Sequence, residues 1–116
     1  MESNFKDKYP FEKRKSEADN VYQKYPDRVP VIVLKHKSSD LPDIDKCKYL
    51  VPKDMTMSQF MFVIRKRIKL DSSQTLFITV NNGLVTTSNV LSSIYHDNKD
   101  EDGFLYVTYT NENVFG

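Results

Sequence analysis

Three side chains of the types that enzymes use for nucleophilic or metal chemistry stand far apart in this sequence. His36, Cys47 and His96 fall on separate predicted elements, and their spacing matches no pattern of metal ligands. The sequence also contains no glycine-rich phosphate loop and no motif of an activated nucleophile. A single cysteine next to a strand more often packs than reacts. We therefore predict a protein that is not an enzyme and that holds no metal or other cofactor.

The last six residues offer a different chemistry. The segment 111–116 carries no catalytic side chain and finishes with Gly116. Because glycine has no side chain, such a tail can thread a narrow channel and present an unhindered carboxylate. The residues alone predict an accessible, flexible tail that is compatible with covalent attachment, with the reacting nucleophiles supplied by other proteins.

The length and charge of the chain favour a single domain without a nucleic-acid partner. Its 116 residues suffice for one hydrophobic core, and 17 basic against 16 acidic residues give a net charge of +1. The charges are unevenly spread, since residues 46–69 hold seven basic residues and one acid, whereas residues 95–116 hold five acids and one lysine. We expect a basic face that favours a negatively charged partner, on a protein that is monomeric in solution.

The expected compartment follows from the cysteine count and the hydropathy pattern. Cys47 is the only cysteine, which excludes an internal disulfide and favours a reducing compartment. No stretch is apolar over the length of a membrane span, and the charged N-terminus has no apolar signal core. The sequence predicts a cytoplasmic protein that acts at a membrane only if another group is added to it.

Hydrophobic periodicity and turn residues divide the chain into helices and strands. Thr56 and Gln59 have the spacing of a capping box at the start of one helix, and the turn at 81–83 requires positive φ. One stripe of an earlier helix is formed by Phe11, Ala18, Val21, Tyr22 and Tyr25. The predicted elements are a helical turn at 4–8, a helix at 11–24, strands at 29–34 and 48–51, a helix from 56, a strand at 75–80, a short helix at 88–95 and a strand at 104–109.

Two strands, a crossing helix and two further strands form the β-grasp arrangement of ubiquitin-like domains. We predict an α+β fold with a four-stranded mixed sheet and a crossing helix, preceded by two N-terminal helices. One structural domain would then comprise a helical extension packed on the core at 1–26, the β-grasp at 27–110 and the tail at 111–116. Periodicity alone leaves other α+β topologies open.

Several segments carry a resemblance to a known family. They are PFEKR at 10–14, KYPDRVPVIV at 24–33, DK at 45–46, KYLVP at 48–52, IRKRI at 64–68, VNN at 80–82, FLY at 104–106 and the final glycine. These segments resemble the ubiquitin-like modifiers of autophagy, of the type of the gamma-aminobutyric acid receptor-associated protein and the microtubule-associated light chains. Because they run in order along the whole chain, the resemblance covers the fold as well as the tail.

The resemblance implies conjugation of Gly116 to phosphatidylethanolamine and a role in autophagosome formation. The implied partners are an activating enzyme of E1 type, a carrier enzyme of E2 type, and a cysteine protease that processes precursors and removes the lipid. The protein would be cytoplasmic and, once conjugated, bound to the autophagosome membrane. The alternative is an adaptor of the same fold that acts without conjugation in vesicle or receptor trafficking.

The resemblance also implies a groove that binds receptor peptides with an aromatic-x-x-aliphatic motif as an added strand. Its aromatic pocket would consist of Glu17, Val21, Pro30, Ile32, Lys48, Leu50 and Phe104. Its aliphatic pocket would consist of Tyr49, Val51, Pro52, Met55, Phe60 and Val63. Arg28, Lys46, Lys48 and Arg67 would meet acidic residues beside the motif. Without the resemblance, the apolar members of both pockets would be interpreted as core.

Two features depart from the family pattern. Cys47 stands where the family commonly has lysine, which removes one positive charge beside the peptide strand, and its thiol is expected to be partly exposed. Met55, Met57 and Met61 make the aliphatic pocket and its surroundings more adaptable than branched side chains would.

Overall fold

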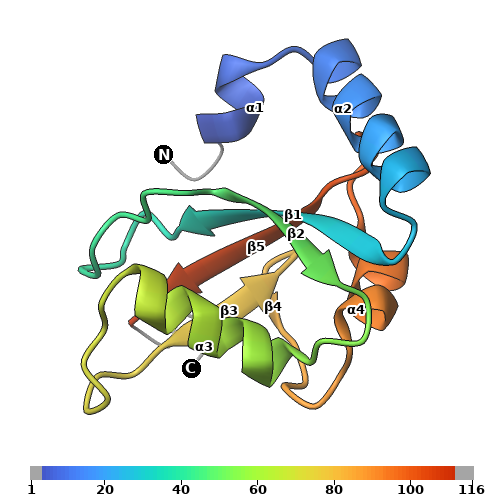
Figure 1. The fold of residues 1–116 in the computed structure, drawn as a ribbon. Coiled ribbons are helices and arrows are strands. Elements are labelled where there is room, and N and C mark those ends of the chain that lie inside the picture. Colours follow the sequence, from blue (N-terminus) through green and yellow to red (C-terminus); the bar gives the residue numbers. More distant parts are fainter. Residues whose placement is uncertain (1–3, 112–116) are drawn as a thin grey trace.

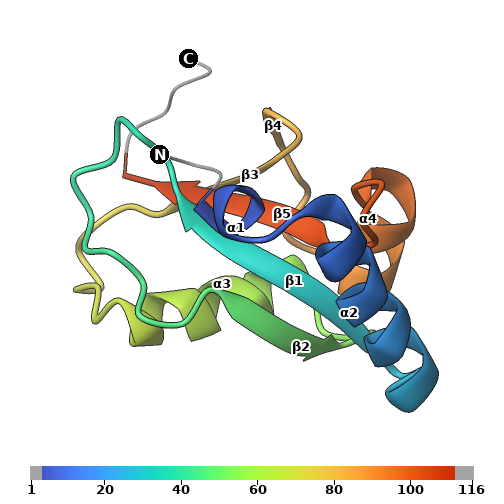
Figure 2. The same cartoon turned by 90° about the horizontal axis from the view of Figure 1, so that it is seen from above.

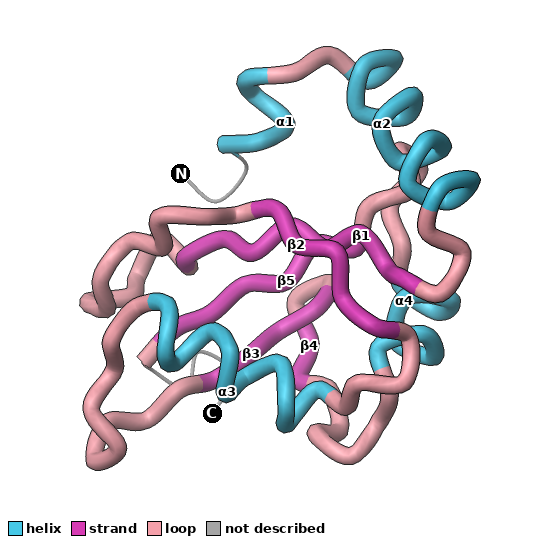
Figure 3. The backbone as a smooth tube through the Cα atoms, in the orientation of Figure 1, coloured by secondary structure: helices cyan, strands magenta, loops and turns pink. Residues whose placement is uncertain are grey.

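The computed structural model describes residues 4–111, which form one mixed β-sheet covered by helices (Figure 1, Figure 3). The strand order is β2-β1-β5-β3-β4, with β1 parallel to β5 and all other neighbours antiparallel. The strands are β1 (Arg28–Lys35), β2 (Lys48–Pro52), β3 (Phe77–Val80), β4 (Gly83–Leu84) and β5 (Leu105–Thr110), and the helices are α1 (Asn4–Lys8), α2 (Phe11–Lys24), α3 (Met57–Arg67) and α4 (Leu91–Asn98). None of these helices is long and apolar enough to cross a bilayer.

The predicted α+β fold and order of elements are confirmed, with one additional strand. The sheet has five strands rather than four because the chain turns back directly after β3 and pairs with it. Asn81 and Asn82 have φ angles of 52° and 63°, the left-handed conformation that a two-residue hairpin turn needs. This turn sets Thr79 opposite Leu84 and so creates the short edge strand β4.

The last helix, α4, begins at Leu91 rather than at the predicted position 88. The carbonyl oxygens of Thr87 and Asn89 accept hydrogen bonds, each 2.9 Å long, from the first two backbone amides of α3. The segment before α4 therefore stays extended and satisfies amides that a helix start leaves without partners. The predicted capping box of Thr56 and Gln59 is confirmed and completes this N-terminus.

Strand β1 contributes to two separate hydrophobic clusters because successive side chains of a strand point to opposite faces. Val29, Val31 and Val33 belong to the main core, which also contains apolar side chains of α3 and α4. Ile32 belongs to a second cluster, with Phe5, Ala18 and Phe104, beneath α1 and α2. Figure 2 shows α1 and α2 along β1, away from α3, so the sheet separates the two clusters.

The helix α2 approaches the rest of the molecule through its smallest apolar residue. Ala18 is buried, whereas Phe11, Tyr22 and Tyr25 of the predicted stripe are exposed. Gly103 makes this approach possible, since its φ is +93° and a Cβ atom added there would lie only 2.8 Å from the Cβ of Ala18. The close packing of α2 therefore depends on a glycine in the loop before β5.

A buried carboxylate strengthens the same junction. Asp102 accepts a hydrogen bond from the Arg14 guanidinium at 2.5 Å, from the Tyr106 hydroxyl at 2.6 Å and from the backbone amide of Phe104 at 2.9 Å. Burial, together with the hydrogen bond to Asp102, raises the pKa of Tyr106 well above its usual value. Asp102 thus joins α2 to the start of β5 and fixes the backbone at Phe104.

We predict that Gly103→Ala destabilises the protein by about 2–4 kcal/mol, because alanine adds left-handed strain and a clash with Ala18. Gly83→Ala is the matched control, since Gly83 lacks positive φ and its nearest atom, the Val80 carbonyl oxygen, lies 3.7 Å from the added Cβ. Urea unfolding of both variants measures the difference. Equal losses of stability would contradict the role assigned to Gly103.

We further predict that Asp102→Asn costs about 3 kcal/mol of folding stability, because the nearly buried guanidinium of Arg14 loses its anionic partner. The control is Asp19→Asn, which breaks an exposed ion pair with Lys15 on the outside of α2. That change is expected to cost no more than about 0.5 kcal/mol. Thermal unfolding compares the two, and a similar loss in both would show that the Asp102 pair contributes no more than a surface pair.

Candidate functional site

The strand β2 lies at one edge of the sheet and has β1 as its only strand neighbour within residues 4–111. Pro30 faces Leu50 in this pair and has no backbone N–H group that could donate a hydrogen bond. The backbone N–H of Val33 donates to the Cys47 carbonyl at 2.7 Å. Because hydrogen-bonding residues alternate in an antiparallel pair, the backbone groups of Lys48 and Leu50 point away from β1. They form a free edge to which another extended segment can be added.

The predicted pocket residues on β2 point alternately to the two faces of the sheet. Lys48 and Leu50 lie opposite Ile32 and Pro30, and residues that face each other across a pair share one side of the sheet. These residues therefore lie on the side of α1 and α2. Tyr49 and Val51 point to the other side, toward α3, and a peptide on the β2 edge would have one predicted pocket on each side.

The structure brings the predicted aromatic-pocket residues together around α2, β1 and the start of β5. Ile32 and Phe104 are fully buried in the second cluster. Glu17 of α2 forms an ion pair with Lys48 of β2 across the surface above them. Leu50 remains 37% exposed at the edge. The remaining members, Val21 and Pro30, are half-buried on α2 and buried on β1, respectively.

The predicted aliphatic-pocket residues gather between β2 and α3. Tyr49 and Phe60 pack edge to face with ring centroids 5.7 Å apart, and both are buried, as is Val51. These three side chains are part of the main core, as the alternative interpretation of the sequence holds. Accessible surface is left at three half-buried residues, which are Pro52, Met55 and Val63.

One polar atom in this region is buried without a hydrogen-bond partner among the described residues, the Tyr49 hydroxyl. Burial raises the pKa of Tyr49, the positive charge of Arg67 opposes this shift, and the charge of Asp45 adds to it. The hydroxyl therefore lies in the field of the charged groups where α3 ends.

The four predicted contacts for acidic residues all lie at or beside β2. Arg28 donates to the Leu50 carbonyl at 3.4 Å, and Arg67 pairs with Asp45 at 2.9 Å. The Lys46 ammonium lies 5.3 Å from the centre of the Tyr49 ring. Together with Lys48 they form a basic border along the free edge. Because exposed ion pairs such as that of Arg67 with Asp45 contribute little to stability, acidic residues of a partner can replace the present partners of these basic side chains.

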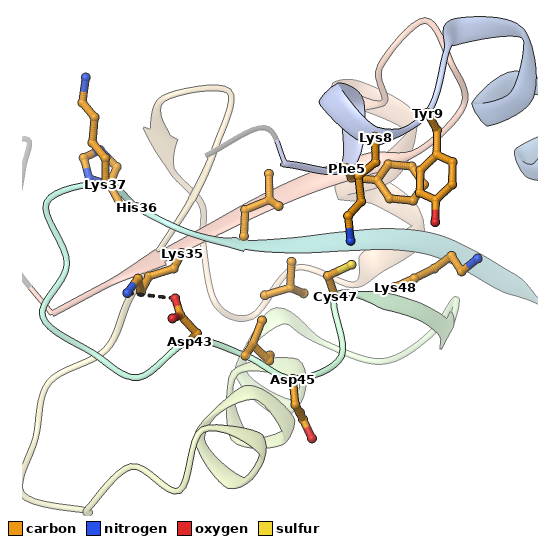
Figure 4. A pocket seen from close by; sticks show the side chains of 13 residues that line it. Phe5, Lys8, Tyr9, Lys35, His36, Lys37, Asp43, Asp45, Cys47 and Lys48 are labelled. Carbon is orange, nitrogen blue, oxygen red and sulfur yellow. Dashed lines mark ion pairs between the residues drawn. The ribbon is translucent and has the colours of Figure 1, made fainter. Parts of the chain in front are cut away.

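A groove of about 750 Å³ lies between α1, the second half of β1 and the start of β2 (Figure 4). Phe5 and Lys8 of α1 and the adjacent Tyr9 form one wall, and Cys47 and Lys48 lie across β1 from them. Cys47 is partly exposed there, as predicted. The N-terminal residues were absent from the predicted site. The aromatic pair Phe5 and Tyr9, four residues apart, is the one sequence signal that could have placed them together.

Two further predictions concern chemistry elsewhere in the chain. Gly116 and most of the tail lie outside the described residues, which extend to position 111. Within residues 4–111, no three His, Cys, Asp or Glu side chains gather in a way that could hold a metal ion.

Solved structures of other proteins share this fold over nearly the whole chain. Trypanosoma brucei ATG8 superposes with a TM-score of 0.92 at 42% sequence identity, and the match covers all of both chains. Plasmodium falciparum Atg8, solved in complex with a P. falciparum Atg3 peptide, gives a TM-score of 0.87 at 35% identity over 94% of this chain and 96% of that one.

Sequence comparison leads to the same family. A family model described as "Autophagy protein Atg8 ubiquitin like" matches residues 13–116. Autophagy-related protein 8 of Neosartorya fischeri and that of Aspergillus niger are each 58% identical over 116 residues, covering all of this chain and 98% of the relative. The resemblance found in the sequence is therefore confirmed, and the chain belongs to the Atg8 family of ubiquitin-like autophagy proteins.

Proposed function

We propose that this protein is a modifier whose Gly116 is joined to phosphatidylethanolamine, and that it recruits receptors to forming autophagosomes through the free edge of β2. The observation that carries the recruiting role is the edge itself, with outward backbone groups at Lys48 and Leu50 and a basic border. Family membership over residues 13–116 supports the conjugating role. The protein would be cytoplasmic before conjugation and membrane-bound after it.

The proposed conjugation uses a carboxylate of this chain and catalytic groups of other proteins. An activating enzyme would join the Gly116 carboxylate to AMP with release of pyrophosphate from ATP. A cysteine thiolate would then displace AMP to give a thioester, which passes to the carrier enzyme. The lipid amine finally attacks the thioester carbonyl, so that an amide forms and the thiol leaves. The two acyl chains, at ~0.8 kcal/mol per buried CH₂, provide stable attachment. The chain itself would not be an enzyme.

The proposed recruitment relies on strand addition. An extended peptide would form backbone hydrogen bonds with β2, while its aromatic and aliphatic side chains enter on opposite sides of the sheet. Acidic residues beside the motif would meet Arg28, Lys46, Lys48 and Arg67. The complex of the P. falciparum relative with an Atg3 peptide supports peptide binding as a property of this fold.

We predict that Leu50→Ala weakens binding of an acidic aromatic-x-x-aliphatic peptide by about tenfold, since the peptide loses an apolar contact worth about 1.4 kcal/mol. Leu84→Ala is the control, because Leu84 is also exposed but lies on β4, at the opposite edge of the sheet. Isothermal titration calorimetry measures both affinities. An unchanged affinity in Leu50→Ala would place the peptide elsewhere.

We predict that Gly116→Ala abolishes conjugation, because the added methyl group crowds the carboxylate in the enzymes' narrow channel. The test combines the activating and carrier enzymes, ATP and phosphatidylethanolamine liposomes, followed by flotation. Gly83→Ala, which changes a glycine of β4, should float with the liposomes like the unchanged protein. Equal flotation of Gly116→Ala and the unchanged protein would rule out covalent attachment at this residue.

The second candidate is an adaptor that acts without conjugation. It is favoured by the β2 edge itself, because this edge belongs to the folded sheet and includes no residue of the tail. Such an adaptor would bind receptor peptides equally well with or without a lipid. A shift of the cellular protein to a lipid-modified form during starvation would separate the two functions, since only the modifier requires it.

A further inference from the structure

The side chain of Phe5 occupies a site made for an aromatic ring. It is 7% exposed and packs edge to face against Phe104, with ring centroids 5.3 Å apart. We call the surrounding residues, Ile32, Leu34, Phe104 and Tyr106, the Phe5 pocket. Two of them, Ile32 and Phe104, are also fully buried members of the aromatic pocket proposed above. A peptide ring that contacts these two residues therefore competes with Phe5 for the same apolar surface.

Among the residues that the structure describes, few contacts besides those of Phe5 hold α1 in place. The helix has five residues, and a helix of this length is not stable without tertiary contacts. Lys6 forms a partly exposed ion pair with Asp100 at 2.8 Å and lies 4.6 Å from the centre of the Tyr106 ring. Exposed ion pairs contribute little to stability. The attachment of α1 thus depends mainly on the burial of one side chain.

The neighbouring helix α2 is held independently of α1. Arg14 is paired with the buried Asp102, and Ala18 packs against the loop at Gly103. Pro10 caps the start of α2, and the Tyr9 carbonyl accepts a hydrogen bond from Nε of Arg14 at 3.0 Å, so the junction between the helices is tied to α2. Release of α1 would therefore leave α2, Glu17 and the β2 edge where they are.

Release of α1 would also enlarge the groove beside β2. Phe5, Lys8 and Tyr9 form its N-terminal wall, and Lys48 lies on its opposite side (Figure 4). The Phe5 ring shows that an aromatic side chain fits the Phe5 pocket. The lysines on both sides of the groove favour a ligand with acidic residues beside its aromatic ring. The occupant that fits best is an acidic peptide segment with one aromatic residue.

From this geometry we infer that α1 is a displaceable plug: Phe5 fills part of the peptide's aromatic site, and binding of an acidic aromatic peptide expels α1 from the sheet. The inference rests on the proposed recruiting function, whose ligand it shares. Because only the fraction of molecules with α1 released can bind, the plug weakens the apparent affinity by that fraction. The N-terminus would thereby set the threshold at which receptors bind.

Hydrogen exchange of the full chain provides the direct test, with an acidic aromatic-x-x-aliphatic peptide as the probe. While α1 is packed on the sheet, the amide of Tyr9 donates to the Phe5 carbonyl at 3.2 Å. Saturating peptide should accelerate exchange at this amide and in α1, while amides in the middle of α2 keep their protection. Unchanged or slower exchange in α1 on peptide binding would overturn the inference.

Peptide affinities of three variants provide the second test. Phe5→Ala should bind the peptide three- to tenfold more tightly, and Tyr22→Ala, which truncates a 72% exposed ring on α2, should bind as the unchanged protein does. Lys6→Gln should bind about two- to threefold more tightly. This change removes a positive charge, so electrostatic attraction of an acidic peptide cannot explain a gain.

The outcomes separate the plug from the function on which it rests. Peptide binding by the unchanged protein, with equal or weaker binding by both Phe5→Ala and Lys6→Gln, would overturn the plug and leave recruitment intact. Absence of binding in the unchanged protein and in all variants would overturn recruitment and the plug together. If Phe5→Ala fails to fold, Lys6→Gln and the exchange experiment still decide.

Discussion

Strand β1 pairs in parallel with β5 on one side and antiparallel with β2 on the other, and the remaining elements are arranged around this double pairing. In this register, Val31 lies between Tyr49 and Leu105, while Ile32 lies between Lys48 and Tyr106. One residue enters the core beneath α3 and the next enters the cluster beneath α1 and α2. A shift of β1 by one position would exchange the two clusters, so each helix layer depends on this register.

Local signals in the sequence predicted much of the fold. The capping box of Thr56 and Gln59 acts within four residues, and the two asparagines of the turn select their own backbone conformation. The predicted start of α4 is wrong because the carbonyl groups before this helix accept hydrogen bonds from amides of α3, an interaction between distant segments. The exposure of Tyr22 and Tyr25 has a similar origin, since α2 is positioned by Gly103 and Asp102, far along the chain.

The candidate site was predictable only through the resemblance to a family. Periodicity assigns Val51 and Phe60 to the core, and the structure agrees, although both also border the proposed aliphatic pocket. Nothing in the local sequence places Glu17 beside Lys48, because the pair bridges a helix and a strand. Phe5 was missed for the same physical reason. Its inferred function in the site rests on its contact with Phe104, a residue from the other end of the chain.

The hydrogen bond from Arg28 to the Leu50 carbonyl has a consequence for self-association. An unpaired strand edge attracts any extended backbone, including that of another copy of the same protein. Here the strand is only five residues long, ends at Pro52, carries Lys48, and has one outward carbonyl already bonded to a guanidinium. Two copies that met edge to edge would bring like charges together and displace both arginines without replacing their partners. A partner with its own carboxylates offers Arg28 a new acceptor as the old one is lost, so the same side chain disfavours aggregation and favours acidic strands.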